Sequence, residues 1–343
     1  MAEEQPVFEP APPSNEFINV VATVFKPKPT SNTDGAVNGD NHVSEQCLKE
    51  LSIAISSATL ARLVIGRTLE PSGRVVEALF ALQRPVSIRI FDIRKIEAVL
   101  AFEQKWNVTV AIQKNSVFRK QKRLAVFDMD STLIQQEVID EIARKIGVEK
   151  EVSAITARAM NGELDFTASL RERCRLLKGV PSTVFEDLKS VITLTPGAAD
   201  LVRALKRLGF KTAVLSGGFT PLCSWLAERL GLDYAYANHL VVSEDGKSLT
   251  GEVEGDIVHA EMKREHVLRI AKENRIALDQ VLVVGDGAND LPMMGVAGLG
   301  VAFNAKPKVQ LAAPARLNSN SLLDVLYLLG LTRAEVDELL QVM

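Results

Sequence analysis

An uninterrupted apolar run, LAVF at residues 124–127, constrains the fold of this chain more than any other feature. Such a run is typical of a strand that is buried on both faces of a parallel sheet. Similar runs occur in TAVLSGG, QVLVVGDG and LGVAF, and amphipathic segments such as GAADLVRALKRLG separate them. Short strands that alternate with helices predict an α/β fold with a doubly wound parallel, Rossmann-like sheet in residues 124–343.

A long insertion with helical patterning, at about residues 136–192, follows the first of these strands. It contains no convincing buried strand. The insertion begins close to the carboxyl end of the sheet, where α/β proteins hold their ligands. We therefore expect it to form a helical cap over a site at that edge.

The chain before residue 124 has a different pattern. Helices are predicted at about residues 43–57 and from about Asp92 onward. Strands are predicted in INVVATVF, LARLVIGRTLE, RVVEALFALQ and VTVAIQK, with VSIRIF as a possible further strand. Without VSIRIF the order is β-α-β-β-α-β, which predicts an α+β, ferredoxin-like domain at residues 17–115.

Three polar segments lie beside or within this domain. Residues 1–16 lack periodic apolar residues and are predicted to be a disordered tail. Residues 26–42 are predicted to be a polar loop inside the domain. Residues 116–123 are predicted to be a solvated linker, whose charged residues are Arg119, Lys120, Lys122 and Arg123.

Composition excludes several classes of partner. The formal net charge of -3 disfavours nucleic acid or an anionic membrane, because both select basic surfaces. Three widely spaced cysteines, Cys47, Cys174 and Cys223, form no CxxC pair and indicate a reducing compartment. The acidic, proline-rich start is unlike a signal peptide, and no apolar run is long enough to span a bilayer. We expect a cytoplasmic protein with a small-molecule substrate.

Four short motifs carry the candidate chemistry: DMDST at 128–132, SGG at 216–218, Lys263, and GDGANDLP at 285–292. Each of them alone has an ordinary structural explanation, such as a turn or a solvated charge. Together they would place Asp128, Asp286 and Asp290 near one point. Three clustered carboxylates are electrostatically unfavourable without a cation, and Mg²⁺ is the ion that best fits oxygen ligands of this kind.

A phosphate group that arrives at such a metal needs donors for its other oxygens. The hydroxyl of Ser216, the backbone N–H groups of Gly217 and Gly218, and the ammonium of Lys263 can supply them. Asp128 would attack phosphorus and form an aspartyl-phosphate. Asp130 would protonate the leaving oxygen and later take a proton from the attacking water. The motifs therefore predict a phosphoryl-transfer site.

In their order and spacing these motifs resemble those of the haloacid dehalogenase-like phosphatases, and residues 124–330 resemble the phosphoserine phosphatases among them. The resemblance implies Mg²⁺-dependent hydrolysis of O-phospho-L-serine to L-serine and phosphate, the last step of the phosphorylated route of serine synthesis. It also implies one Mg²⁺ per site, held by side-chain oxygens of Asp128 and Asp286 and by the backbone carbonyl of Asp130. In the same family Asn289 and Asp290 orient the site.

The resemblance assigns substrate-binding roles to four residues of the cap. Glu137 and Arg173 match the acid and the arginine that bind the ammonium and carboxylate of phosphoserine. Met160 and Phe166 match the apolar positions that close over it. Without the family match each would be read as a helix charge or as ordinary cap core.

Other functions stay open at this point. A relative that acts on phosphothreonine, another small phosphomonoester or a phosphoprotein would keep every core motif and differ in the cap. A catalytically silent sensor of serine or phosphate is disfavoured by the intact Asp128, Asp130, Lys263 and Asp286. The first domain is similar to ACT-type regulatory domains in its inferred element order, so serine sensing, packing and homodimer formation are all open to it.

Overall fold

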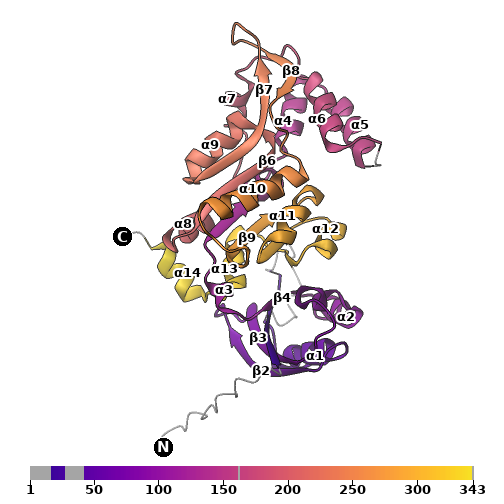
Figure 1. Ribbon diagram of the computed structural model, residues 1–343, viewed down its shortest axis with the longest axis vertical. Coiled ribbons are helices and arrows are strands. Elements are labelled where there is room, and N and C mark those ends of the chain that lie inside the picture. Colours follow the sequence, from indigo (N-terminus) through magenta and orange to yellow (C-terminus); the bar gives the residue numbers. More distant parts are fainter. Residues whose placement is uncertain (1–16, 28–41, 161–162, 342–343) are drawn as a thin grey trace, which may run out of the picture.

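A computed structural model describes residues 17–27, 42–160 and 163–341. The predicted tail and most of the predicted polar loop lie outside these residues. The described chain forms an N-terminal domain, a core domain and a cap, which follow one another along the long axis of the molecule (Figure 1).

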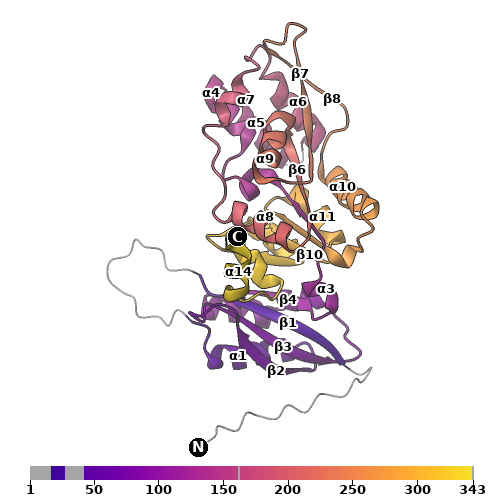
Figure 2. The same ribbon diagram turned by 90° about the vertical axis from the view of Figure 1, so that its left-hand side faces the viewer.

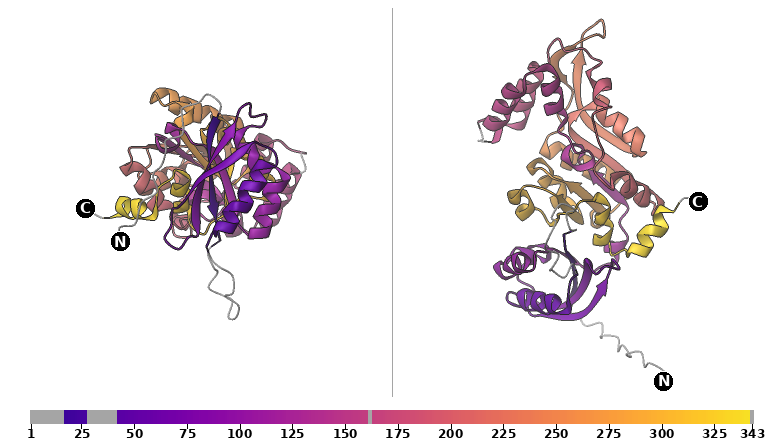
Figure 3. Two further views of the ribbon diagram at one scale, coloured as in Figure 1. Left: turned by 90° about the horizontal axis from the view of Figure 1, so that it is seen from below. Right: turned by 180° about the vertical axis from the view of Figure 1, so that it is seen from behind.

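The N-terminal domain is a four-stranded sheet with helices on one face (Figures 2 and 3). The strand order is β2-β3-β1-β4, and neighbouring strands are antiparallel. This topology confirms the predicted ferredoxin-like unit, whereas its ACT-like character stays a prediction. The elements are β1 (Phe17–Phe25), α1 (Glu45–Ser56), β2 (Ala61–Thr68), β3 (Val75–Gln83), η1 (Ile90–Lys95), α2 (Glu97–Trp106) and β4 (Thr109–Lys114).

The prediction of a possible strand at VSIRIF is wrong. Residues Ile90–Lys95 form the 3₁₀ turn η1, and within the described chain the residues before it pair with no strand. Val86, Ile88 and Ile90 do alternate, but they are partly buried against the core of the domain. The apolar alternation therefore reflects packing of an irregular segment rather than a strand.

The core domain is a seven-stranded sheet with the order β11-β10-β9-β5-β6-β7-β8. All neighbouring strands are parallel except β7 and β8, which confirms the predicted doubly wound sheet. Its strands are β5 (Leu124–Phe127), β6 (Lys211–Phe219), β7 (Tyr234–Val242), β8 (Leu249–Glu254), β9 (Val281–Gly285), β10 (Leu299–Phe303) and β11 (Ala315–Leu317).

Helices cover both faces of this sheet. Ala125 and Phe127 of β5 pack into one core cluster together with α8 and α9, while Leu124 and Val126 pack into another with α10, α11 and α12. This burial on both faces explains the uninterrupted apolar run. The helical segments of the domain are α8 (Ala198–Arg207), α9 (Thr220–Leu230), α10 (Ala260–Glu273), η3 (Leu278–Gln280), η4 (Ala288–Asp290), α11 (Leu291–Val296), α12 (Pro307–Ala312), η5 (Leu322–Asp324), α13 (Val325–Leu328) and α14 (Arg333–Leu340).

Four helices occupy the predicted insertion and form the cap. The hairpin of β7 and β8 extends beside them, so that α6 packs against β8 (Figure 1). Neither strand of this hairpin was predicted from the sequence. The turn η2 (Met129–Leu133) leads from β5 into the cap, whose helices are α4 (Val138–Ile146), α5 (Glu149–Met160), α6 (Phe166–Arg175) and α7 (Val184–Leu188).

The segment between the two domains is not a solvated linker. It contains the short helix α3 (Val117–Lys120), and Arg119 and Lys122 are buried. Arg119 Nη2 lies 2.8 Å from Glu77 Oε2, and Lys122 Nζ donates to the carbonyl of Asp279 at 2.6 Å. Because these cations bind groups from both domains, the expectation of solvation holds only for the exposed Lys120 and Arg123.

Candidate active site

The site forms where three neighbouring strands end. β5 lies between β6 and β9, and the three strands are parallel. Asp128 follows β5, Ser216 and the two glycines after it lie near the end of β6, and Asp286 follows β9. Carboxyl ends of adjacent parallel strands meet at one edge of a sheet, which brings these motifs together.

A tight turn after β5 aims the two carboxylates of DMDST. Ser131 has a left-handed backbone (φ 54°), which is uncommon for a non-glycine residue. Asp128 Oδ1 accepts the N–H of Met129 at 2.7 Å, and Asp130 Oδ2 accepts the N–H of Val138 at 3.3 Å. Asp130 Oδ1 is buried and has no hydrogen-bond partner among the described residues. An orphaned buried oxygen of this kind is expected where a ligand is to bind.

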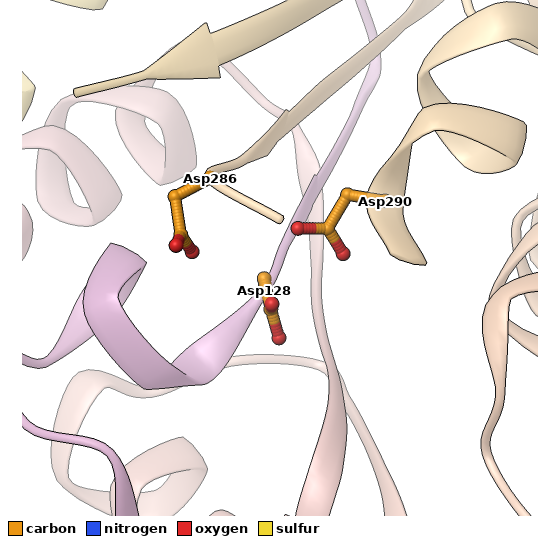
Figure 4. A group of neighbouring side chains, drawn as sticks. All are labelled: Asp128, Asp286 and Asp290. Atoms are coloured by element: carbon orange, nitrogen blue, oxygen red, sulfur yellow. The ribbon is translucent and has the colours of Figure 1, made fainter. Parts of the chain in front are cut away.

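Three carboxylates form a cluster around one point. Ligand oxygens of Asp128, Asp286 and Asp290 lie within 4.8 Å of one another, and Figure 4 shows Asp286 and Asp290 on either side of Asp128. The fully buried Lys263 places its Nζ 2.8 Å from both Asp128 Oδ1 and Asp290 Oδ1. Among the described residues, the side chain of Asp286 accepts a hydrogen bond only from the hydroxyl of Thr132, at 3.0 Å.

The electrostatics of the cluster favour a cation. Burial raises the pKa of Asp128 well above its usual value, and Asp290 adds to this rise while Lys263 opposes it. Burial and Asp290 raise the pKa of Asp286 to about 7. Burial alone would lower the pKa of Lys263, but Asp128 and Asp290 raise it. One ammonium does not neutralise three carboxylates, so this oxygen-rich donor set fits a hard divalent ion such as Mg²⁺.

Asp130 has a different environment from Asp128. Burial raises its pKa to about 8, and the nearby carboxylate of Glu137 adds to the rise. Its carboxyl group is therefore mainly protonated at neutral pH. A protonated carboxyl at this position can donate a proton to a leaving group, which is what acid catalysis requires.

Two glycines of GDGANDLP allow the carboxylate of Asp290 and the amide of Asn289 to lie close to the backbone. A Cβ on Gly285 would lie 2.4 Å from Asp290 Oδ2, and a Cβ on Gly287 would lie 2.1 Å from Asn289 Oδ1. The N–H of Gly287 donates to Asp290 Oδ2 at 3.0 Å. Side chains at these positions would displace Asp290 and Asn289.

Buried side chains of the core domain hold the SGG loop in place by hydrogen bonds. Ser216 is fully buried, and its Oγ accepts the N–H of Gly218 at 2.9 Å, which leaves the hydroxyl hydrogen able to donate. Asn238 of β7 donates to the carbonyl of Gly217 at 2.8 Å and accepts the N–H of Val258 at 2.8 Å. Sequence reasoning missed Asn238, because it acts across the sheet and YAYANHL carries no local signal.

A cavity of about 620 Å³ joins the carboxylate cluster to the cap. Glu137 accepts the hydroxyl of Ser131 at 2.7 Å, and desolvation raises its pKa although the residue as a whole is exposed. Arg173 is half-buried, and no carboxylate of the described chain forms an ion pair with it. Phe166 lies against Gly217, where a Cβ would be 3.1 Å from the ring. Opposite charges and an apolar ring thus share one wall.

The structure brings most of the predicted site residues to this cavity. Ser216 and Lys263 do not line it, since both are buried beneath its floor. Met160 ends α5, and its side chain lies outside what the structure describes. The predicted residues that line the cavity are Asp128, Asp130, Glu137, Phe166, Arg173, Gly217, Gly218, Asp286 and Asn289.

Two whole-chain expectations can be compared with the structure. Cys47, Cys174 and Cys223 are all free and buried, as small apolar residues are. Among the described residues, no helix combines the length and apolarity needed to cross a bilayer.

The sequence matches a known family model and is similar to curated proteins. A family model described as haloacid dehalogenase-like hydrolase matches residues 122–298. The chain is 48% identical over 235 residues to a Schizosaccharomyces pombe protein named probable phosphoserine phosphatase. The aligned region covers 68% of this chain and 79% of the relative.

Two solved structures are similar. One, a probable phosphoserine phosphatase from Vibrio cholerae in unliganded form, matches 94% of this chain and 89% of its own with a TM-score of 0.66 and 31% identity. The other, a substrate-bound phosphoserine phosphatase complex, matches 60% of this chain and 97% of its own with a TM-score of 0.56 and 46% identity.

Proposed function

The chain belongs to the haloacid dehalogenase-like hydrolase family, and on that premise we propose that it hydrolyses O-phospho-L-serine to L-serine and phosphate, the last step of serine biosynthesis. The observation that carries this proposal is one cavity with two halves. Asp128, Asp130 and Asp286 lie at its core end, and Glu137 and Arg173 lie at its cap end. The first half suits phosphate chemistry, and the second suits the ammonium and carboxylate of an amino acid.

We propose Mg²⁺ as the cofactor, one ion per site, bound by side chains of Asp128 and Asp286 and by the backbone carbonyl of Asp130. The bound ion supplies positive charge that stabilises the transferring phosphoryl group. Asp290 belongs to the same carboxylate cluster and accepts from Lys263, so that it holds the ammonium in place.

Asp128 is the proposed nucleophile. Its carboxylate attacks phosphorus while the bond from phosphorus to the serine oxygen breaks, which gives an aspartyl-phosphate and serine. Lys263 contacts Asp128 Oδ1, where it orients this carboxylate and opposes the rise that burial causes in its pKa. A water molecule then attacks the aspartyl-phosphate, which releases phosphate and restores Asp128.

Asp130 is the proposed acid and base. Its raised pKa, about 8, keeps the proton that the serine oxygen takes as it leaves. Once deprotonated, the same carboxylate accepts a proton from the attacking water. The unpartnered Oδ1 is the atom available for these transfers.

Glu137 and Arg173 are the proposed determinants of substrate choice. The guanidinium of Arg173 can bind the substrate carboxylate through two hydrogen bonds, and Glu137 can accept from its ammonium. Phe166 beside Gly217 and, by family resemblance, Met160 would close over the substrate. Gly217, Gly218 and Asn289, which line the cavity, would surround the phosphate, and Ser216 would hold their loop through its bond to Gly218.

Two cap variants test the substrate. Glu137→Gln and Arg173→Ala should each lower kcat/KM for phosphoserine about ten- to a hundredfold, because each removes a charge-assisted hydrogen bond. Activity on an aryl phosphate, which lacks both amino-acid groups, should change little. Arg171→Ala is a matched control, since Arg171 is an exposed residue of the same helix.

The alternatives give other results. Equal losses on phosphoserine and the aryl phosphate would contradict an amino-acid pocket, and a wild-type preference for a different phosphomonoester would replace the substrate. Phosphate binding without any hydrolysis would support a silent sensor instead.

We also propose that the protein is cytoplasmic and forms a homodimer through the N-terminal domain. The three free cysteines fit a reducing compartment. β2 is an edge strand, and the apolar side chains of Leu60, Val64 and Ile65 on or beside it are exposed. Such edges commonly pair with another chain. A monomeric mass in solution scattering would contradict the dimer.

A further inference from the structure

Helix α12 contacts both the active-site cavity and the N-terminal domain. Lys306, its N-cap residue, and Val309 line the cavity. The opposite end of the helix meets Arg94 of η1, a turn of the N-terminal domain. In Figure 1 this helix lies between the level of the cap helices and that of α2. One short element therefore connects the N-terminal domain to the site.

Arg94 fixes the C-terminal end of α12. Its side chain is fully buried, and Nη2 donates to the carbonyls of Gln310, at 2.6 Å, and of Ala313. Nε donates to the carbonyl of Pro314 at 3.1 Å. The last carbonyls of a helix have no partner within it, so a buried guanidinium that satisfies them holds this end in one position.

Lys306 has no ion-pair partner of its own. Its side chain is exposed, and within the described ranges no carboxylate lies at ion-pair distance from it. Lys263, by contrast, is fully engaged with Asp128 and Asp290. A lysine at a helix N-terminus also adds positive charge where the peptide dipoles are already positive, so helix stability does not account for it.

The cavity needs such a cation. Its lining contains more acidic than basic side chains, and a phosphate monoester that enters carries negative charge. An unpaired ammonium on the wall would attract the phosphate and offset this repulsion. The acidic residues of the lining are Asp128, Asp130, Glu137, Asp140 and Asp286, and the basic ones are Arg173 and Lys306.

We infer that Lys306 recognises the phosphate group of the substrate, and that Arg94 of the N-terminal domain acts as its positioning residue through α12. The inference rests on the proposed phosphatase function and adds to it a second basic residue on the open wall of the cavity. It also gives the N-terminal domain an indirect part in substrate binding, through α12.

The test compares Lys306→Ala with Lys308→Ala. Lys308 is exposed on the same helix but does not line the cavity, so it is a matched control. At low ionic strength Lys306→Ala should raise KM about three- to tenfold with kcat nearly unchanged, and Lys308→Ala should match wild type. The effect should shrink as salt is added, because salt screens the attraction.

The substrate panel separates the possible failures. The Lys306→Ala effect should persist on an aryl phosphate, which shares only the phosphate with phosphoserine. An effect confined to phosphoserine would overturn phosphate recognition, as would equal behaviour of the two lysine variants. If the wild-type enzyme cleaves the aryl phosphate but not phosphoserine, the proposed substrate fails while Lys306 is still tested.

Arg94→Lys tests the connection to the N-terminal domain. This conservative variant keeps the charge but has fewer donors for the carbonyls of α12. It should raise KM in the wild-type background and have no further effect on KM in Lys306→Ala. The same loss in both backgrounds, or a loss in kcat alone, would overturn the positioning role. If Arg94→Lys does not fold, the comparison of Lys306→Ala with Lys308→Ala still decides whether Lys306 recognises the phosphate.

Discussion

Asp128 and Asp130 lie two residues apart on the same cavity, but their carboxyl groups have different neighbours. Lys263 contacts Asp128 directly, whereas Asp130 has Glu137 nearby and one oxygen without a partner. The ammonium opposes the rise that burial causes in the pKa of the first carboxyl, whereas Glu137 adds to the rise in the pKa of the second. This contrast supports the proposed division into nucleophile and acid.

Asp130→Asn should separate substrates by their leaving groups. Without the acid, kcat/KM for phosphoserine should fall about 10²- to 10⁴-fold, because the serine oxygen is a poor leaving group unless it is protonated. An aryl phosphate, whose phenolate leaves without a proton, should lose much less. Steady-state kinetics on both substrates measure this difference. Equal losses on the two would contradict the role of Asp130 as acid.

At the residue scale the sequence predicts most of the residues that the structure brings to the cavity. Asp128, Asp130 and Asp286 can be found because each follows an apolar strand in a short motif. Asn238 and Lys306 cannot, since one holds the loop from a neighbouring strand and the other reaches the cavity from a helix with no motif. Their roles depend on tertiary contacts that no local pattern records.

At the scale of elements, the loop after β9 depends on two glycines for its shape. Gly285→Ala would place a Cβ 2.4 Å from Asp290 Oδ2 and move this carboxylate away from Lys263. We expect kcat/KM to fall about 10²-fold, since small misplacements of catalytic groups have effects of this size. Phosphate release at saturating Mg²⁺ measures the loss.

Gly295→Ala is the matched control for this variant. Gly295 lies in α11, the next helix, and a Cβ there would meet nothing within 4 Å. It should keep wild-type activity and lose no stability, because alanine favours helix more than glycine does. Similar activities for the two variants would contradict the close-approach explanation.

The elements that were predicted differ physically from those that were missed. Strands buried on both faces, such as β5 and β9, produce apolar runs that are visible in the sequence. β7 and β8 extend beyond the sheet as a hairpin next to the cap, and their partly exposed residues produce no such run. VSIRIF shows the opposite error, because its apolar residues alternate as in a strand but the segment pairs with no strand of the described sheet.

At the scale of the whole molecule, two buried cations join the domains at residues that were predicted to be solvated. Burial lowers the pKa of Lys122 to about 8. Between about pH 8 and pH 10.5 the folded protein therefore binds fewer protons at this site than the unfolded chain, and stability rises with pH. Below that window the buried charge is destabilising in full.

Lys122→Met removes this charge. The free energy of unfolding of the variant minus that of wild type should be largest near neutral pH. It should decrease by up to about 3 kcal/mol as pH rises through the window. Urea unfolding at several pH values measures the difference. Lys120→Met, at an exposed position nearby, should show no such trend, and a pH-independent difference for Lys122→Met would contradict a desolvated ammonium.

The central claim is that Asp128 attacks the phosphate of phosphoserine with the help of Mg²⁺. The most direct measurement is phosphate release from L-phosphoserine, with and without Mg²⁺, by the wild-type chain and by Asp128→Asn, beside phosphothreonine and an aryl phosphate. We predict strong, Mg²⁺-dependent preference for L-phosphoserine and a loss of at least about a thousandfold in the variant. Undiminished activity in Asp128→Asn, or activity confined to the other phosphates, would contradict the account.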